Sequence, residues 1–503
     1  MKKKSKNKLR FALPFVLVTA SCIFCVPVWA QKFNVAPGSP VLLGDAVAIS
    51  VDGLLPNQTI KIVSERVVVE WGGEKRALYR AEAAFNADAS GKVDLATAEP
   101  KTGAFKAGTL ETGTSETGTY KRADVRGLFW SMRPVKEEVP ADRPLMEVRL
   151  KATNITDNTL IAEKTITFIK ALPDVVTEAV EQFPGAVFAI QKTAAGLSPQ
   201  RVVNAPASSS APAATPTPTP TKRPAIILLG GSEGGSTVTR GAAQLASHGF
   251  AVLALPYYSP PNWPSQKAEL PALPAAFADI PIERLNAARA WLKTRPDVDA
   301  NRIAIHGTSK GAEFALLAAV HLPWVTAVVA IVPSDVVWEG WGDKVEPGKR
   351  ASFAFNGKPF AFVPYVDFAQ EFMGYQTGED IRIRRPQDKG RAAHPAAAVS
   401  ARIQVERIKA PVLLVAGQDD QVWNSAMMAH NIAERRAAAK LDTVSLIYTE
   451  AGHYLTGTGF EPTTQYDLGL MKGGGTPMGN AKAQADAWPK TIEFLKRTLA
   501  AKN

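Results

Sequence analysis

From residue 224 onwards, short apolar runs alternate with longer stretches that have helical periodicity. The apolar runs, such as 224–229 and 411–416, are continuous, which is typical of parallel strands covered on both faces. The stretches 283–292 and 427–438 repeat their apolar residues with a helical period. This alternation predicts an α/β domain over 224–503, a mostly parallel sheet with helices on both faces.

The first part of the chain follows a different pattern. Between residues 31 and 170, segments such as 59–63 and 146–151 alternate polar and apolar residues and are separated by turn signals. This pattern predicts an all-β, immunoglobulin-like sandwich domain. Residues 171–223 are expected to form a connector, which ends in a linker rich in Pro, Thr, Ala and Ser at 205–221.

Residues 1–30 have the pattern of a secretory signal peptide. A strongly basic start precedes a mainly apolar run from 11 to 26, and small side chains lead up to Ala30. We expect cleavage after Ala30 and export to the periplasm or the medium. A membrane anchor is one alternative, although the apolar run is short for a span and contains Pro14. Lipoprotein anchoring at Cys22 is another.

The leader also accounts for the cysteines and for much of the charge. Cys22 and Cys25 are the two cysteines of the chain, so the mature protein would have no disulfide and no thiolate metal site. Removing the six basic residues of the leader lowers Lys plus Arg from 58 to 52 against 47 acidic residues, and the net charge falls from +11 to +5. No dense basic and aromatic patch indicates nucleic-acid binding.

Residues 307–311 read Gly-Thr-Ser-Lys-Gly, which matches the G-x-S-x-G pattern. An apolar run at 303–305 precedes it and a helix-like run at 312–319 follows it. Strand, sharp turn and helix form the context of a nucleophile elbow, in which the serine is lifted above the sheet edge. The pattern predicts Ser309 as a nucleophile; the alternative is a glycine-rich turn that only packs tightly.

A carboxylate that could orient a histidine follows a later strand. The apolar run 411–416 leads into Gly417-Gln418-Asp419-Asp420, at the end of a predicted buried strand. Two carboxylates are adjacent, and only one can point correctly. We favour Asp420, three residues after the glycine, and keep Asp419 as the alternative; otherwise Asp419 is a turn residue.

The candidate base is found by elimination among six histidines. His453 lies in a glycine-flanked loop after the predicted strand 444–448, beyond the acid. The other five lie in predicted helices, under the elbow or in a polar insert. His453 therefore completes the chain order serine, acid, histidine. The alternative is a lone histidine in a surface loop.

The remaining component is an oxyanion hole. One donor in hydrolases of this design is the N–H after the nucleophile, here Lys310, and the other comes from the loop after an early strand. That loop is 230–235, and we expect Ser232 as the donor, with Gly231 or Glu233 as alternatives. The loop lacks the ending of a P-loop and the dinucleotide fingerprint. We therefore expect no cofactor and no metal.

With these motifs, the chain resembles the acyl-CoA thioesterase / bile acid-CoA:amino acid N-acyltransferase family from about residue 33 to its end. The segments that carry the resemblance are 307–313, 249–255 with Tyr257 and Tyr258, 417–420, 451–453, 473–477, 483–488, and upstream 91–95 and 127–134. The resemblance implies a β-sandwich followed by an α/β-hydrolase domain. It carries the family's Ser (or Cys), Asp and His over to Ser309, Asp420 and His453. Members that acylate an amine tend to have cysteine at the elbow, so Ser309 implies water as the acceptor.

An insert at about 334–400 is rich in aromatic and charged residues. We expect it to form a cap over the site, which would favour fatty or aromatic acyl groups; the alternative is a peripheral subdomain. Glu313 is interpreted as an acidic residue in the first turn of a helix, favourable to the helix dipole. No role is assigned to the Lys310 side chain.

The expected function is that of an exported serine hydrolase that cleaves small-molecule substrates, acyl thioesters or carboxylic esters, through a Ser-Asp-His triad and an acyl-enzyme. CoA thioesters belong to the cytoplasm, so export favours a different acyl donor. A serine peptidase, an amidase or an acyltransferase on the same fold is an alternative. A non-catalytic secreted binding protein is another.

Overall fold

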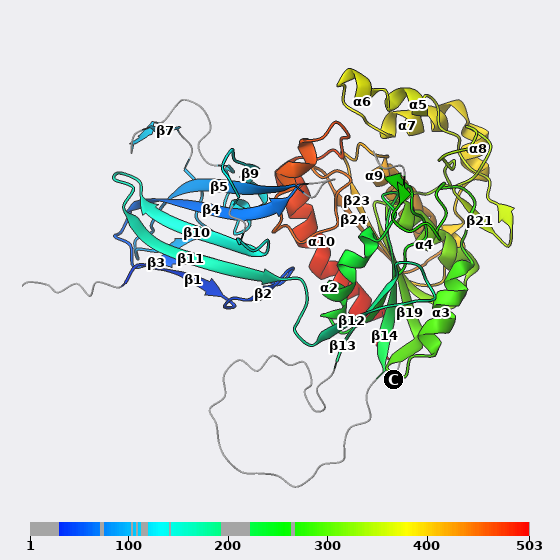
Figure 1. The fold of residues 1–503 in the computed structure, drawn as a ribbon, viewed down its shortest axis with the longest axis horizontal. Coiled ribbons are helices and arrows are strands. Elements are labelled where there is room, and N and C mark those ends of the chain that lie inside the picture. Colours follow the sequence, from blue (N-terminus) through cyan, green and yellow to red (C-terminus); the bar gives the residue numbers. More distant parts are fainter. Residues whose placement is uncertain are drawn as a thin grey trace, which may run out of the picture.

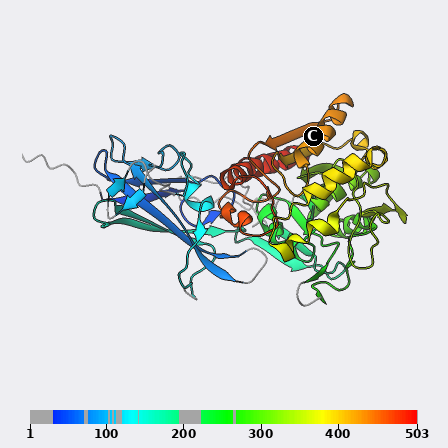
Figure 2. The same ribbon diagram turned by 90° about the horizontal axis from the view of Figure 1, so that it is seen from above.

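The computed structural model describes residues 30–70, 75–101, 104–106, 109–111, 119–139, 142–192, 222–262 and 267–501. They form two lobes side by side, an N-terminal β lobe and a larger C-terminal α/β lobe (Figures 1 and 2). The predicted leader up to Trp29 and the linker 205–221 lie outside the described residues. In the described part of the chain, no helix combines the length and the apolar character needed to span a membrane.

The N-terminal lobe is the predicted sandwich of two sheets. The three-stranded sheet contains β1 (Lys32–Ala36), β3 (Ala48–Asp52) and β6 (Val93–Asp94), in that order. The six-stranded sheet runs β2 (Val41–Leu42), β11 (Leu160–Ile169), β10 (Glu147–Asn154), β4 (Thr59–Val69), β5 (Arg76–Asn86) and β9 (Arg133–Pro134). Buried residues alternate along β4, as the sequence pattern requires, and the inner faces of both sheets share one apolar core.

The C-terminal lobe is built on an eight-stranded sheet. Its strands, in spatial order, are β12 (Val175–Ala179), β13 (Val187–Gln191), β15 (Ala251–Ala254), β14 (Arg223–Leu229), β19 (Val298–Thr308), β20 (Val325–Ile331), β23 (Val412–Gly417) and β24 (Thr443–Tyr448). The six strands from β15 to β24 are parallel, whereas β12 and β13 are antiparallel to their neighbours. The predicted α/β-hydrolase sheet, mostly parallel, is confirmed.

The expectation that 171–223 is only a connector is wrong for its first part. β12 and β13 form a hairpin that extends the hydrolase sheet, with Val187 opposite Ala254 and Ile190 opposite Ala251. The burial of the apolar side chains of β13 accounts for this placement. The second lobe therefore begins before the low-complexity linker. That linker lies between β13 and β14 in the sequence, and its composition is typical of a domain boundary.

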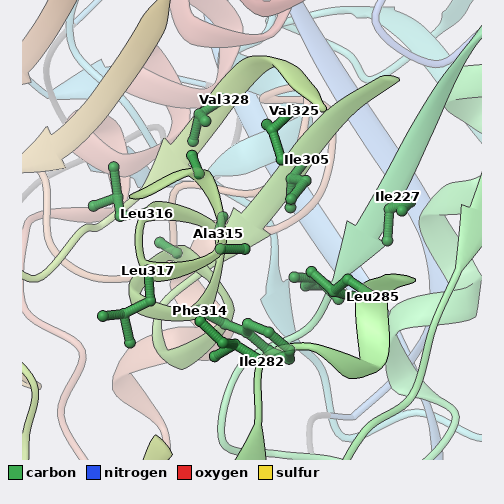
Figure 3. Packing of buried hydrophobic residues seen from close by; sticks show 14 of the residues in the cluster. Ile227, Ile282, Leu285, Ile305, Phe314, Ala315, Leu316, Leu317, Val325 and Val328 are labelled. Atoms are coloured by element: carbon green, nitrogen blue, oxygen red, sulfur yellow. The ribbon is translucent and has the colours of Figure 1, made fainter. Parts of the chain in front are cut away.

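Helices cover both faces of the hydrolase sheet. The first face packs against α3 (Arg284–Lys293), α4 (Lys310–His321) and α9 (Ser425–Ala438), and the second packs against α2 (Ala242–Ala246) and α10 (Pro477–Thr498). Figure 3 shows the first core, where Ala315 of α4 lies near the strand that carries Ile305, and Phe314 lies beside Ile282. Such continuous burial on both faces explains why the strands read as unbroken apolar runs.

The insert predicted at 334–400 lies at one end of this sheet, and its helices form the outermost layer in Figure 1. It contains β21 (Phe353–Phe355), β22 (Lys358–Pro359), α5 (Phe368–Glu371), α6 (Gly374–Thr377), α7 (Arg384–Ala393) and α8 (Pro395–Ser400). Trp338 and Phe353 are buried, and Phe353 contacts Phe314 of α4 with ring centroids 5.1 Å apart. Part of the aromatic character of the insert therefore serves to attach it to the elbow helix.

The remaining elements are short. They are α1 (Gly127–Trp130), β7 (Ala104–Lys106), β8 (Thr109–Glu111), η1 (Thr237–Gly241), β16 (Pro261–Asn262), β17 (Lys267–Ala268), β18 (Ile280–Pro281), η2 (Val405–Arg407) and η3 (Thr463–Asp467). The parallel strands β14, β19, β20 and β23 end at the same edge of the sheet, where the predicted site residues follow them.

Candidate active site

Ser309 lies in the tight turn between β19 and α4. Its backbone has φ 56° and ψ −122°, a region that residues other than glycine rarely adopt. The flanking glycines are required by close backbone contacts. A Cβ atom on Gly307 would lie 2.0 Å from the carbonyl oxygen of Gly311, and one on Gly311 would lie 2.3 Å from that of Gly230. The elbow thus needs the glycines of its motif to bring strand, helix and neighbouring loop together.

The structure brings Ser309, His453 and Asp420 into one hydrogen-bonded series. The Nε2 atom of His453 is 3.0 Å from the Ser309 Oγ atom, and its Nδ1 atom is 2.8 Å from Asp420 Oδ2. All three residues are buried, with exposed fractions of 7%, 8% and 0% for Ser309, His453 and Asp420. Low exposure strengthens these polar contacts because few water molecules compete for them.

Asp420 is held by the backbone that follows it. Its Oδ1 atom accepts hydrogen bonds from the N–H groups of Val422, at 2.9 Å, and Trp423, at 3.1 Å. The other oxygen is left to face His453. Each carboxylate oxygen therefore has a separate task, and the side chain has little freedom to rotate.

Asp419 has different partners. Its Oδ2 atom accepts from the N–H of Gly475 at 2.9 Å, and its Oδ1 atom accepts from the Gln421 amide at 2.6 Å. Asp419 therefore ties two loops together, while Asp420 contacts the histidine. Of the two carboxylates that the sequence left open, the geometry therefore favours Asp420.

The glycine-rich loop after β14 lies against the elbow. A Cβ atom on Gly231 would be 3.2 Å from the Cβ of Ser309, so this part of the loop lies close to the serine. Its N–H donates to Glu233 Oε1 at 3.0 Å. The Tyr257 hydroxyl donates to the carbonyl of Gly230 at 2.7 Å and helps to fix the loop. Ser232 follows Gly231 and is exposed.

The Lys310 side chain has a partner that the sequence interpretation did not identify. Its Nζ atom is 2.6 Å from Glu313 Oε2 and 2.8 Å from the Ser352 hydroxyl, and both charged side chains are buried. Glu313 also accepts the N–H of Trp338 at 3.2 Å. Burial lowers the pKa of Lys310 and raises the pKa of Glu313, and the mutual attraction opposes both shifts.

Glu313 is therefore more than a first-turn acid that suits the helix dipole: it is half of a buried ion pair that joins the elbow helix to the insert. The spacing of three residues between Lys310 and Glu313 on a helix is the signal that could have indicated the pair. The insert also contacts the acid loop, where Arg384 donates to the carbonyl oxygen of Asp420 at 3.0 Å. It thus touches two components of the candidate site.

A cavity of about 250 Å³ lies on the face of the sheet that α2 and α10 cover. Thr308, Gly230 and Leu455 form part of its wall, and so does His306. Burial lowers the pKa of His306 to about 4, so its imidazole is neutral at pH 7. His306 lies in β19, three residues before Ser309 in the sequence, and His453 is the histidine whose Nε2 atom contacts the serine.

Three family models match the chain. Residues 280–501 match the BAAT / acyl-CoA thioester hydrolase C terminal, and residues 44–109 match the acyl-CoA thioester hydrolase/BAAT N-terminal region. Residues 210–342 also match the dienelactone hydrolase family. The first two matches fall on the two lobes, in the order that the resemblance implied.

Named relatives are similar over nearly the whole chain. Mitochondrial acyl-coenzyme A thioesterase 2 of Mus musculus is 28% identical, over 94% of this chain and 92% of the relative. Acyl-coenzyme A thioesterase 6 of Mus musculus is 27% identical, over 93% and 97%. The peroxisomal succinyl-coenzyme A thioesterase of Mus musculus is 26% identical, over 93% and 97%.

Among solved structures, a putative dienelactone hydrolase from Klebsiella pneumoniae is 15% identical with a TM-score of 0.37, covering 64% of this chain and 99% of that one. The Pyrococcus furiosus esterase Pf2001 is 17% identical with a TM-score of 0.33, covering 56% and 85%. The family matches to both lobes, together with relatives similar over nearly the full length, show that this chain belongs to the acyl-CoA thioesterase/BAAT family.

Proposed function

We propose that the protein hydrolyses acyl thioesters, and carboxylic esters of similar acyl groups, through a covalent acyl-enzyme on Ser309. The observation that carries the proposal is the buried series from Ser309 Oγ through His453 to Asp420, with contacts of 3.0 and 2.8 Å. An alcohol becomes a useful nucleophile when a positioned base can remove its proton, and this series supplies such a base.

In the first step, His453 Nε2 takes the proton of Ser309 as the Oγ atom attacks the acyl carbonyl. Asp420 holds the proton on His453 Nδ1 and stabilises the imidazolium that forms. The negative charge on the carbonyl oxygen is stabilised by the N–H of Lys310 and by a second N–H from the loop after β14. Because the Gly231 N–H already donates to Glu233, we assign the second donor to Ser232.

Collapse of the tetrahedral intermediate breaks the bond to the leaving group, which departs as a thiol or alcohol with the proton from His453. Water then enters, and His453 removes one of its protons while the oxygen attacks the acyl-serine. The free acid leaves and Ser309 regains its proton. No step of this cycle needs a group beyond the residues named and water.

The substrate class comes from the family. The protein is an acyl-CoA thioester hydrolase-like enzyme, since relatives named acyl-coenzyme A thioesterases are similar to it over more than nine-tenths of its length. We propose in addition that the acyl group is fatty or aromatic and that simple esters are cleaved as well.

The acyl acceptor provides a direct test of the reaction. We expect an acyl thioester supplied with glycine or taurine to yield free acid and almost no amide, because Ser309 stands where amine-acylating relatives tend to carry cysteine. Product analysis by mass spectrometry, after labelling with a fluorophosphonate has shown that Ser309 is reactive, measures this ratio. Amide as the main product would establish an acyltransferase instead.

We also propose export, with cleavage after Ala30, on the basic start and apolar run of the leader. Intact-mass measurement of protein recovered outside the cytoplasm should show Gln31 at the N-terminus. The same sample settles the anchoring question, since an acylated Cys22 would instead make the protein a lipoprotein. Full-length protein retained in the cytoplasm would contradict export.

A further inference from the structure

The chain leaves the candidate site at His453 and returns to it twenty residues later. The N–H of His453 donates to the carbonyl of Gly473 at 2.8 Å, and the N–H of Gln421 donates to the same oxygen at 3.2 Å. Residues 454–472 therefore form an excursion whose two ends meet beside Asp420 and His453. A Cβ atom on Gly473 would lie 2.2 Å from the ring of Tyr454, so the returning chain packs closely against the residue that follows His453.

The far part of this excursion is anchored in the other lobe. Phe460 is fully buried, and its side chain belongs to the apolar core of the N-terminal sandwich. Its ring lies 5.3 Å from that of Phe129 and 5.3 Å from that of Phe168, measured between centroids. The guanidinium of Arg126 lies over the same ring at 4.8 Å. A catalytic-lobe side chain thus completes the sandwich core.

Polar contacts hold the backbone of the excursion at the same place. Buried Arg66 of β4 donates to the carbonyl of Phe460 at 3.1 Å and to that of Leu145 at 3.3 Å. The hydroxyl of Thr464 in η3 donates to the carbonyl of Met132 in the sandwich. Buried polar groups are costly to leave without partners, so these bonds resist separation of the loop from the sandwich.

The anchored turn is in contact with the neighbour of the histidine. Tyr466 lies in η3 two residues after Thr464, and its ring centroid is 4.7 Å from that of Tyr454. Gln484 of α10 donates to the carbonyl of Tyr454 at 2.8 Å. A continuous set of contacts therefore runs from the sandwich through η3 and Tyr454 to His453. Figure 2 shows α10 at the junction of the two lobes.

We propose that the β-sandwich is a positioning domain for the catalytic base, and that Phe460 is the positioning residue through which it holds the His453 loop. The inference rests on the proposed role of His453 and assigns a task to a lobe that carries none of the reacting groups. The alternative is that the sandwich only stabilises the protein and has no effect on the position of His453. Misplacement of a catalytic group by about 1 Å can cost 10²-fold in rate, so release of the loop should appear in kcat.

The matched pair of variants is Phe460→Ala and Phe85→Ala. Both phenylalanines are fully buried in the same sandwich core. Phe85 pairs with Ile60, whereas the anchor Arg66 lies six residues further along β4, a separation of about 20 Å. We expect Phe460→Ala to lower kcat by about 10- to 100-fold with KM changed less than about threefold. Phe85→Ala should lower the melting temperature while leaving kcat unchanged.

Thr464→Val is the milder second variant, because it keeps the side-chain shape and removes the hydrogen bond to Met132. Thr464→Val should also lower kcat. If Phe460→Ala does not fold, Thr464→Val alone tests the positioning role. The full-length protein is measured below the melting temperature of every variant. The rate of Ser309 labelling by a fluorophosphonate and the acid limb of the kcat/KM profile against pH are followed, since both depend on His453.

Slower labelling and a displaced acid limb in Phe460→Ala or Thr464→Val, but not in Phe85→Ala, support the positioning role. Folded variants that label Ser309 at the wild-type rate would overturn it, and so would an equal loss of rate in Phe85→Ala. Wild-type protein that does not label at Ser309 would instead overturn the proposed function itself. The failures of the two proposals are therefore distinguishable.

Discussion

Replacement of Ser309 by alanine is expected to lower kcat for an acyl thioester by on the order of 10⁴–10⁶, while the protein stays folded. The hydroxyl is the group that would become the acyl-enzyme, and its Oγ atom lies 3.0 Å from the Nε2 atom of His453. Both serine and alanine carry a Cβ atom, so the strain of the backbone at φ 56° is nearly the same in both proteins. Steady-state kinetics and thermal unfolding measure the two halves of this expectation.

The matched control is Ser400→Ala. Ser400 lies at the exposed end of α8, and its hydroxyl donates to the helix carbonyls of Ala396 and Ala397. This variant should keep wild-type kinetics. Peptide mapping of the fluorophosphonate adduct completes the test: an adduct on any serine other than Ser309, or retained activity in Ser309→Ala, would end the proposal.

The local parts of the site could be predicted from the sequence because each is encoded within a few residues. The elbow requires glycine at 307 and 311, since any Cβ there would collide with backbone. Buried parallel strands are unbroken apolar runs, so their ends could be placed and the residues that follow them identified. Parallel strands then bring those ends to one edge of the sheet.

The choice between Asp419 and Asp420 was left open because it depends on a distant segment. Gly475 provides the N–H that occupies Asp419, and a Cβ on Gly474 would lie 1.8 Å from the carbonyl of Asp419. The chain can pass so close only without a side chain at 474. Residues 473–475 appear in the sequence as a family motif, whereas the structure shows that they bring the returning chain alongside the acid loop.

The features that could not be predicted from the sequence depend on contacts between residues far apart in the chain. Arg66 and Phe460 are 394 residues apart, and no local periodicity links them. The hairpin of β12 and β13 joins the hydrolase sheet across the linker, so the linker could not mark the start of the lobe. The Lys310–Glu313 pair has a local signal in its spacing, but its partner Ser352 in the insert has none.

The two adjacent carboxylates should give opposite results when each is changed to its amide. Asp420 uses one oxygen for the N–H groups of Val422 and Trp423 and the other for His453. Asparagine has a single acceptor oxygen. If that oxygen stays with the two backbone N–H groups, its NH₂ group faces His453 Nδ1 and forces the proton onto Nε2. The imidazole would then present a donor to Ser309 and could not accept its proton.

Asp420→Asn is therefore expected to lower kcat by about 10⁴, the loss that the wrong histidine tautomer causes in a comparable triad, with the fold retained. Asp419→Asn is the internal control. Its amide oxygen can still accept from Gly475, so it should keep most of the activity and lose only a little stability. Kinetics for both variants, with circular dichroism to verify folding, make the comparison. A large loss in Asp419→Asn beside a small one in Asp420→Asn would transfer the orienting role to Asp419 and would require the acid loop to rearrange when substrate binds.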